Sequence, residues 1–183
     1  MSGSLKVGGS ELINDNGGSG SLNWGTGVPA GSVIKKTYYS IGRGTMANDS
    51  FPNDDTIPQR DEGAEIFSQA YTPSTTNCTI IITTYVRISE SSNVGAGMQL
   101  GLFISDSDDA LIVGEVLTNK DNNPNGGNIT LMYSMSGWSG SKTLSLRSSG
   151  GNTYNYSNED QAYATQKFGS AFTSAFIVEE IAT

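Results

Sequence analysis

The chain contains no histidine, and this absence excludes several kinds of site at once. Ser-His-Asp triads, Cys-His pairs, histidine metal sites and histidine pH switches all need the imidazole ring. Catalysis by two carboxylates stays open, because it needs only Asp or Glu. We therefore expect a protein that is not an enzyme of the histidine-dependent kind.

Cysteine and long apolar runs are also scarce. Cys78 is the single cysteine, so no internal disulfide can form. No run of about 18 apolar residues occurs, so we expect no membrane insertion. Residues 1–20 lack the apolar segment of a secretory signal peptide. Stability is expected to come from packing or from oligomerisation.

Charged residues make up only 15 % of the chain, against roughly 25 % in an average protein. The 10 lysines and arginines are scattered, and the net charge is −8. Phosphate backbones and anionic lipids are bound by clustered Lys and Arg, so nucleic acid and membranes are not expected partners. Gly, Ser, Thr and Asn fill the gap, which is typical of turn-rich β proteins.

Alternating apolar residues predict β-strands along most of the chain. The clearest pattern runs from Cys78 to Ile88, where every second side chain belongs to one apolar face. Further strands are expected at residues 33–39, 98–104, 129–135, 142–147, 154–156 and 175–181. An apolar run at 110–117 predicts a strand buried on both faces. Because no segment keeps a helical period, the predicted fold is an all-β antiparallel sandwich or jelly roll of about eight strands.

Residues 1–32 are expected to form an extended Gly- and Ser-rich docking arm, and residues 33–183 a β-sandwich head domain. The arm has too little apolar surface to fold alone, so an ordered arm would lie on another subunit or another protein. Leu12, Ile13 and Trp24 are its candidate anchor residues. The alternative is a flexible linker in which Trp24 has no pocket. Residues 42–59 are expected to form a long loop.

Three aromatic residues of the head are candidates for contact with a ligand or receptor. Trp138 lies among small residues in the sequence Ser136-Gly137-Trp138-Ser139-Gly140, which suggests an exposed loop tip. Exposed aromatic rings stack on sugars and anchor interfaces. The alternative is a tryptophan folded back onto the edge of the sandwich. Tyr154 and Tyr156 share one strand face and could bind a glycan, although cross-strand packing is the favoured interpretation.

Acidic clusters provide candidates for carboxylate catalysis or for Ca²⁺ binding, chiefly at Asp54-Asp55 and Asp106 to Asp109. We favour solvated turn residues at both places, because Asp bonds its own backbone in turns. No catalytic residue, metal-ligand set or cofactor is therefore assigned. Cys78 lies on the apolar face of its strand, so a buried and inert thiol is expected.

The order of several short motifs resembles a β-domain of bacteriophage virion proteins. The sequence Thr56-Ile57-Pro58-Gln59, followed by Glu62-Gly63, precedes the step Thr72-Pro73-Ser74 and the long strand at 78–88. Leu144 to Arg147, Gly150-Gly151 and Tyr154 resemble a later strand and turn of that family, and Phe176 to Ile181 resembles its last strand. The likeness covers about residues 33–183.

This resemblance implies a tail fibre, spike or capsid-fibre protein with a jelly roll similar to the trimeric tumour-necrosis-factor and C1q type. Such a protein would be made in the host cytoplasm and displayed on the virion as a homotrimer. Its arm would contact other virion proteins, and its head would contact a glycan or protein receptor on the host. Two alternatives stay open: a purely structural capsid decoration or adaptor protein, and a glycan depolymerase that uses two carboxylates.

Overall fold

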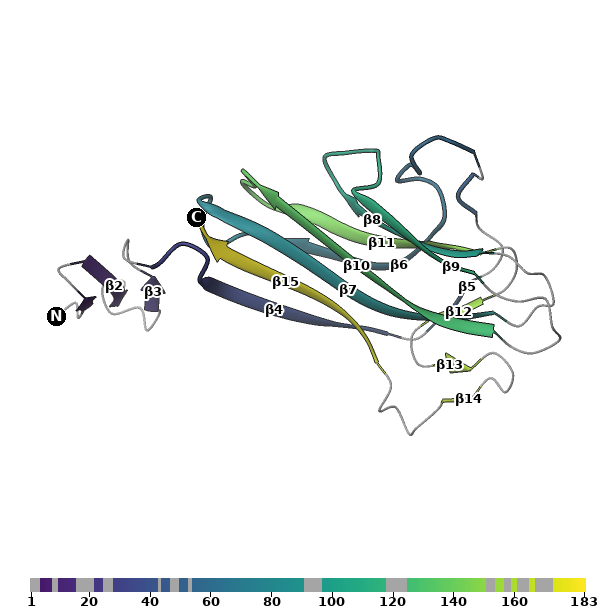
Figure 1. The fold of residues 1–183 in the computed structure, drawn as a ribbon, viewed down its shortest axis with the longest axis horizontal. Coiled ribbons are helices and arrows are strands. Elements are labelled where there is room, and N and C mark those ends of the chain that lie inside the picture. Colours follow the sequence, from purple (N-terminus) through teal and green to yellow (C-terminus); the bar gives the residue numbers. More distant parts are fainter. Residues whose placement is uncertain are drawn as a thin grey trace.

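The computed structural model describes the backbone of residues 4–7, 10–15, 22–24, 28–42, 44–46, 50–52, 54–90, 97–117, 125–150, 154–156, 159–160, 165–166 and 173–183. Side chains are described in 28–42, 44, 50–52, 54–89, 97–117, 127–150 and 173–183. The described part is all-β (Figure 1). It has no helix long and apolar enough to cross a membrane.

Two antiparallel sheets form a sandwich. The first has the order β4 (Val33–Ile41), β15 (Ser174–Ala182), β7 (Cys78–Glu90) and β10 (Asn125–Ser136). Beyond the paired part of β15, the same edge of β7 pairs with β12 (Tyr154–Tyr156), which in turn pairs with β5 (Gly44–Met46). The second sheet has the order β6 (Ala64–Tyr71), β11 (Lys142–Ser149), β8 (Gly97–Ile104) and β9 (Ile112–Leu117).

The strand order is that of a jelly roll. Counted along the chain, the strands of the sandwich follow the order 1-8-3-6 in the first sheet and 2-7-4-5 in the second. Each sheet thus mixes early and late strands, which is the outcome of two interleaved Greek keys. The predicted fold class, an antiparallel β-sandwich or jelly roll, is confirmed.

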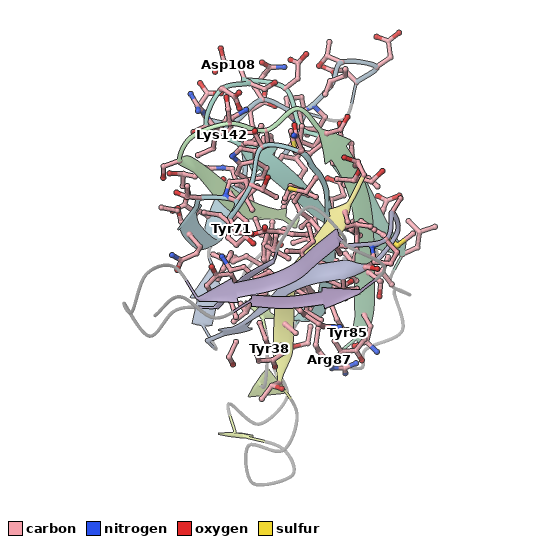
Figure 2. All side chains as sticks on the ribbon, turned by 90° about the vertical axis from the view of Figure 1, so that its left-hand side faces the viewer. Tyr38, Tyr71, Tyr85, Arg87, Asp108 and Lys142 are labelled. Carbon is pink, nitrogen blue, oxygen red and sulfur yellow. The ribbon has the colours of Figure 1, made fainter. Side chains whose placement is uncertain are left out.

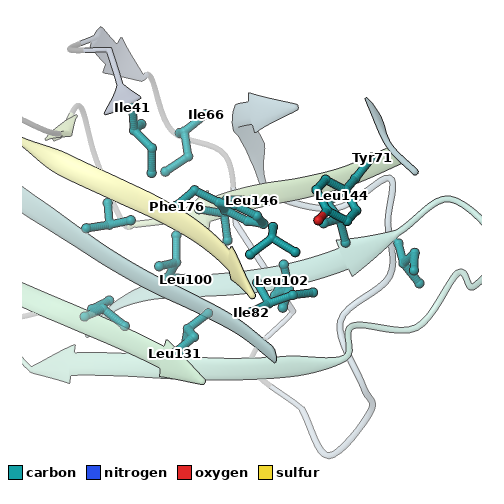
Figure 3. Packing of buried hydrophobic residues seen from close by; sticks show 14 of the residues in the cluster. Ile41, Ile66, Tyr71, Ile82, Leu100, Leu102, Leu131, Leu144, Leu146 and Phe176 are labelled. Atoms are coloured by element: carbon teal, nitrogen blue, oxygen red, sulfur yellow. The ribbon is translucent and has the colours of Figure 1, made fainter. Parts of the chain in front are cut away.

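The core lies between the two sheets and follows from the period of two in each strand. On β7 the even-numbered side chains from Cys78 to Ile88 all point inward and are buried. Except for Thr84, they meet Leu100 and Leu102 of β8 and Leu144 and Leu146 of β11 in one continuous cluster (Figure 3). The buried thiol of Cys78 is 3 % exposed, as expected from its place on the apolar face.

Aromatic rings close the side of the sandwich where β4 and β6 lie. Phe67 of β6 stacks on Phe176 of β15 with ring centroids 4.7 Å apart. Tyr39 of β4 contacts both rings, at 5.9 Å and 6.3 Å between centroids. This cluster ties the two sheets together and makes the last strand of the chain part of the core.

Two strand predictions need correction. The segment at 110–117 is not buried on both faces: Val113, Glu115 and Leu117 are exposed, because β9 is an edge strand and a two-layer sandwich covers only one face of each sheet. Strand β6 has no counterpart in the sequence prediction. The register of β11 against β6 shifts between Leu146 and Arg147, so the inward positions of β6 change from Ala64 and Ile66 to Phe67 and Tyr71, which breaks the period.

The first 32 residues contain three short strands that pair with one another in a separate antiparallel sheet. These are β1 (Ser4–Val7), β2 (Ser10–Asp15) and β3 (Leu22–Trp24). A two-stranded sheet of β13 (Glu159–Asp160) and β14 (Thr165–Gln166) lies within the segment before β15. The division into a docking arm and a head domain stays a prediction.

The chain enters the sandwich beside its own C-terminal strand. The amide of Gly31 donates to the carbonyl of Ala182 at 2.8 Å, and the amide of Ala182 donates to the carbonyl of Ser32 at 2.9 Å. These bonds extend the ladder between β4 and β15 to residue 31. The start of β4 and the end of β15 therefore lie at the same end of the sandwich (Figure 1).

Candidate functional site

The outer face of the β4-β15-β7-β10 sheet carries exposed apolar side chains in one row. The strand register places Tyr38, Ile177, Thr83 and Met132 side by side across the four strands. Tyr38 is 57 % exposed and Met132 is 69 % exposed. Because the inward face of the same strands forms the core, this outward row faces away from the second sheet.

A neighbouring row enlarges this surface. Ser40, Ala175, Tyr85 and Thr130 lie next to one another in the register. On the other side of the first row, Lys36, Glu179 and Ile81 lie next to one another in the register. Lys36 and Glu179 form an ion pair with their charged atoms 3.1 Å apart. We define the sheet-face patch as the residues between these limits, namely Tyr38, Ile81, Thr83, Tyr85, Ala175 and Ile177.

Charged residues border the sheet-face patch at both ends, with Lys36 and Glu179 beside Ile81 and Arg87 beside Tyr85. Figure 2 shows Tyr38 and Tyr85 on one side of the molecule, with Arg87 next to Tyr85, and Asp108 and Lys142 on the opposite side. On that opposite side Arg60 pairs with Asp108 at 3.2 Å. The patch is thus an apolar and hydroxyl-bearing surface on a chain whose net charge is −8.

A buried carboxylate lies on the inner side of the same sheet. Glu180 of β15 is 0 % exposed and is the only acidic or basic residue in the buried class within the described residues. It accepts a hydrogen bond of 2.6 Å from the Tyr71 hydroxyl and others from the amide and hydroxyl of Ser74. Lys35 of β4 lies 3.5 Å from the same carboxylate and 5.0 Å from the centre of the Tyr71 ring.

Burial and hydrogen bonding act in opposite directions on the pKa of Glu180. Burial raises this pKa, but the hydrogen bonds from Ser74 and Tyr71 and the charge of Lys35 outweigh it, so the pKa of Glu180 lies below its usual value. Burial, followed by the hydrogen bond to Glu180, raises the pKa of Tyr71. Burial and the negative charge of Glu180 also raise the pKa of the Cys78 thiol. The cluster therefore consists of the ionised carboxylate of Glu180, neutral donors from Tyr71 and Ser74, and the half-exposed Lys35.

This cluster connects separate segments of the fold through one carboxylate. Both carboxylate oxygens of Glu180 face donors, which come from β4, the end of β6 and the loop after it. The adjacent Glu179 points to the opposite face of β15, because side chains alternate along a strand. Glu179 and Glu180 therefore do not present two carboxylates to one cleft, as glycoside hydrolysis requires.

The prediction of an exposed Trp138 is wrong. Its ring is 1 % exposed, contacts Tyr71 edge-on at 5.8 Å between centroids, and lies under the ammonium of Lys142 at 5.6 Å. The indole nitrogen donates to the carbonyl of Gly140 at 3.0 Å, so the loop folds its tryptophan inward. The small neighbours, including Gly137 with a φ of 73°, permit this tight return, and the alternative interpretation holds.

The other predicted contact residues lie outside the described side chains. The backbone of Tyr154 and Tyr156 is placed in β12, which pairs with β7 and β5. Leu12 and Ile13 lie in β2, and Trp24 lies in β3 opposite Ile13. Their proposed roles in glycan contact and docking stay predictions.

The segment Thr56-Ile57-Pro58-Gln59 and the residues after it connect to the turn that follows β8. We call residues 56–63 the latch segment. Gln59 forms an isolated bridge with Asp109 in the turn after β8, and its side chain donates to Asp109 at 2.8 Å. Arg60 donates to the carbonyl of Ser105 at 2.5 Å and to the carboxylate of Asp108 at 3.2 Å. These bonds join the latch segment to the turn after β8.

The end of the latch segment is held by β11. Arg147 donates to the carbonyls of Glu62 and Gly63 at 2.7 Å and 2.8 Å. Gly63 has a φ of +65°, and a Cβ there would lie 2.5 Å from the ring of Phe51. A glycine is therefore required where the motif has Glu-Gly.

Asp54 and Asp106 lie in a bend and a turn, where each accepts hydrogen bonds. Asp54 accepts from the hydroxyl of Thr56 at 2.5 Å and from its amide at 2.9 Å, and these bonds lower the pKa of Asp54. Asp106 accepts from Lys142 at 2.7 Å, which lowers the pKa of Asp106. No group of three potential metal ligands comes together within the described ranges.

Sequence reasoning missed the residues that matter most in this arrangement. Tyr38 and Met132 were counted only as members of strands, and Glu180 only as a member of the strand at 175–181. The alternation of β15 did hold a signal for Glu180, since an acidic residue at an inward position of an apolar strand needs donors. Which strands lie beside Tyr38 and Met132 depends on the topology.

No protein-family model and no curated protein matches this chain. Solved structures with a similar fold include Eiger TNF from S. frugiperda, at 12 % identity and a TM-score of 0.42, over 80 % of this chain and 92 % of that chain. PorU from Porphyromonas gingivalis matches at 10 % identity and a TM-score of 0.39, over 85 % of this chain and 14 % of that chain. A structure of infectious bursal disease virus matches at 10 % identity and a TM-score of 0.36, over 82 % and 38 %. Because these sequence identities and TM-scores are low, the fold is assigned from the strand order of the two sheets and not from these solved structures.

Proposed function

We propose that this protein is a non-enzymatic structural module of a bacteriophage particle, displayed on its surface as a homotrimer of the fibre or spike type. Its N-terminal segment would attach it to other virion proteins, and its head would contact the host cell. The proposal rests on one observation above the others: the sheet-face patch is apolar and open on a chain with a net charge of −8. The resemblance of the sequence motifs to phage virion β-domains supports the viral setting.

The charge of the chain favours assembly through this patch. Two copies that each carry −8 repel one another, and the repulsion is smallest where the facing surfaces hold few charges. Tyrosine and methionine are enriched at protein interfaces, because they bury a large area with few unsatisfied polar groups. Tyr38 and Tyr85 provide such anchors on one face of the same sheet.

The arrangement of the acidic residues supports a non-enzymatic role. The buried carboxylate of Glu180 is occupied by structural donors, and Asp106 and Asp108 are paired with cations in a turn. A depolymerase would need two carboxylates facing a bound sugar. Release of oligosaccharides from host surface glycans by the purified protein would contradict the proposal.

Light scattering tests the assembly directly. The wild-type protein is expected to have three times the chain mass of 19.3 kDa. Tyr38→Glu places a charge in the patch and is expected to give monomers, while Ser141→Glu in an exposed loop outside the patch should leave the trimer intact. A monomeric wild type would overturn the trimer.

A purely structural role as a capsid decoration or adaptor protein is the second candidate. It is favoured by the burial of Trp138, which removes the exposed aromatic ring expected to contact a receptor. The two roles separate on particles that lack the protein. Loss of adsorption, together with inhibition of normal particles by the purified protein, fits host contact, whereas loss of particle stability with normal adsorption fits decoration. Electron microscopy of labelled particles locates the protein on tail or capsid.

A further inference from the structure

The N-terminal segment joins the sandwich through a single strand, and that strand lies at the edge of a sheet. In the described part, β4 pairs only with β15, in a ladder that runs from Ile41 opposite Ser174 to Val33 opposite Ile181. Strand β15 pairs on its other side with β7, and β7 pairs with β10. Tension that reaches the head from the N-terminal segment therefore passes from β4 through β15 into the centre of the sheet.

The directions of the two strands decide how this ladder carries tension. Strand β4 starts and β15 ends at the same end of the sandwich, where the chain enters (Figure 1). A force that pulls β4 out through that end, against a head held at the opposite end, acts along the strands. Hydrogen bonds between antiparallel strands lie perpendicular to the strands. Such a force therefore loads the bonds of the whole ladder together, in shear, and the ladder fails only as a unit.

The same ladder is weak against a force that separates its two adjacent ends. The amide of Gly31 donates to the carbonyl of Ala182 at 2.8 Å, and the amide of Ala182 donates to the carbonyl of Ser32 at 2.9 Å. A force that moves residue 31 away from residue 182 loads these two bonds first and the others one after another. The strands are then peeled apart a few bonds at a time, so the fold resists one direction of tension more than the other.

Ion pairs on both faces reinforce the loaded end of the ladder. On the outer face Lys36 pairs with Glu179 at 3.1 Å, and on the inner face Lys35 pairs with the buried Glu180 at 3.5 Å. Each pair connects β4 directly to β15. They lie near the chain entry, where the pull from the N-terminal segment enters the strand.

The inner face of β4 fixes the strand in its register. Ile41 is 2 % exposed, and Ile34 and Tyr39 pack against the core. The register shifts between the pairs made by Val33 and Lys35, so Ile34 is an extra residue on β4. Sliding β4 along β15 draws these side chains past the core and moves the extra residue away from its place. Shear therefore has to overcome side-chain packing in addition to the hydrogen bonds.

From these observations we propose that β4 and β15 form a mechanical clamp, which keeps the head joined to its N-terminal segment under tension. The clamp rests on the proposed function, in which the N-terminal segment is fixed to the particle and the head contacts the host. A host surface that moves away from the particle pulls the head away from the chain entry, which is the direction of shear. Forced unfolding depends on the unfolding rate rather than on equilibrium stability, so the clamp is a property of direction.

Pulling single molecules in two directions tests the clamp. Ala30→Cys with Thr173→Cys places handles beside the starts of β4 and β15, at opposite ends of the ladder. Ala30→Cys with Thr183→Cys places them beside the adjacent ends of the same two strands. Cys78→Ala removes the native thiol from both proteins. At equal pulling speed, the first pair of handles is expected to need several-fold more force to open the head than the second.

A second distal handle and a folding control keep this test independent of one variant. Asn128→Cys on β10, combined with Ala30→Cys, again pulls β4 along its axis and should give a similarly high force. Thermal melting checks that each variant is folded, and light scattering checks that all are compared in the same oligomeric state. Equal forces in the two directions, or a lower force along the strands, would overturn the clamp.

Failure of the clamp and failure of the proposed function give different results. Equal pulling forces would overturn the clamp and leave the attachment of the protein to the particle standing. Absence of the protein from purified particles would overturn the proposed function, and with it the load that the clamp is proposed to bear, whatever the pulling forces are. High force along the strands, together with the protein on the particle surface, supports both.

Discussion

The hydroxyl of Tyr71 donates a hydrogen bond of 2.6 Å to the carboxylate of Glu180, a residue 109 positions later in the chain. This bond connects the end of β6 with the inner face of β15, and Ser74 and Lys35 complete the coordination of the same carboxylate. Two sheets and the chain entry are thus joined through one buried charge. The stability of the head should be sensitive to it.

Glu180→Gln is expected to lower the free energy of unfolding by about 2 kcal/mol, because several buried donors lose a charged acceptor. Urea denaturation measures the change. Glu179→Gln is the matched control: its exposed pair with Lys36 should contribute less than about 1 kcal/mol. Equal losses in both variants would show that the buried network adds nothing.

The same carboxylate predicts a dependence of stability on pH. Because the pKa of Glu180 is lower in the folded chain than its usual value of 4.5, its contribution is fully present above that value. As the pH falls through the folded pKa, protonation removes the contribution. Thermal melts between pH 3 and pH 7 should show a smaller acid loss in Glu180→Gln than in wild type, and parallel curves would contradict this assignment.

Trp138→Ala is expected to cost about 3–5 kcal/mol, because a large buried ring leaves a cavity beside Tyr71. A spectroscopic test needs no destabilisation. In a Trp24→Phe background, Trp138 is the one remaining tryptophan, and its emission should lie at the short wavelengths of a buried indole and resist quenching by iodide. Ready quenching by iodide would instead indicate that Trp138 is exposed at a loop tip, as the sequence pattern predicted.

Gly63→Ala is expected to lower stability by about 2 kcal/mol or more, since both the positive φ and the contact with Phe51 oppose a side chain. Gly137→Ala isolates the first term, because its φ is +73° but no atom lies within 4 Å of the new Cβ. It should cost about 1 kcal/mol. If chemical denaturation gives the same loss of unfolding free energy for both variants, the contact between residue 63 and Phe51 does not contribute to stability.

Several features of this protein could be read from local pattern. The alternation between Cys78 and Ile88 was sufficient for a one-sided strand and a buried thiol, because side chains of a strand alternate whatever its neighbours are. The recurrence of such segments, with turns between them, was sufficient for an antiparallel sandwich. The Asp-rich segment after Ile104 was recognised as a turn, because short-range bonds between Asp and backbone are local.

Other features depended on which strands became neighbours. Trp138 is buried because Tyr71 and Lys142 form a pocket for it, and Glu180 is charged in the core because Lys35, Tyr71 and Ser74 converge on it from three distant segments. The sheet-face patch exists only because the order β4-β15-β7-β10 places Tyr38 and Tyr85 on one face. Contacts between residues far apart in sequence leave no periodic signal in either segment, so only the tertiary fold decides them.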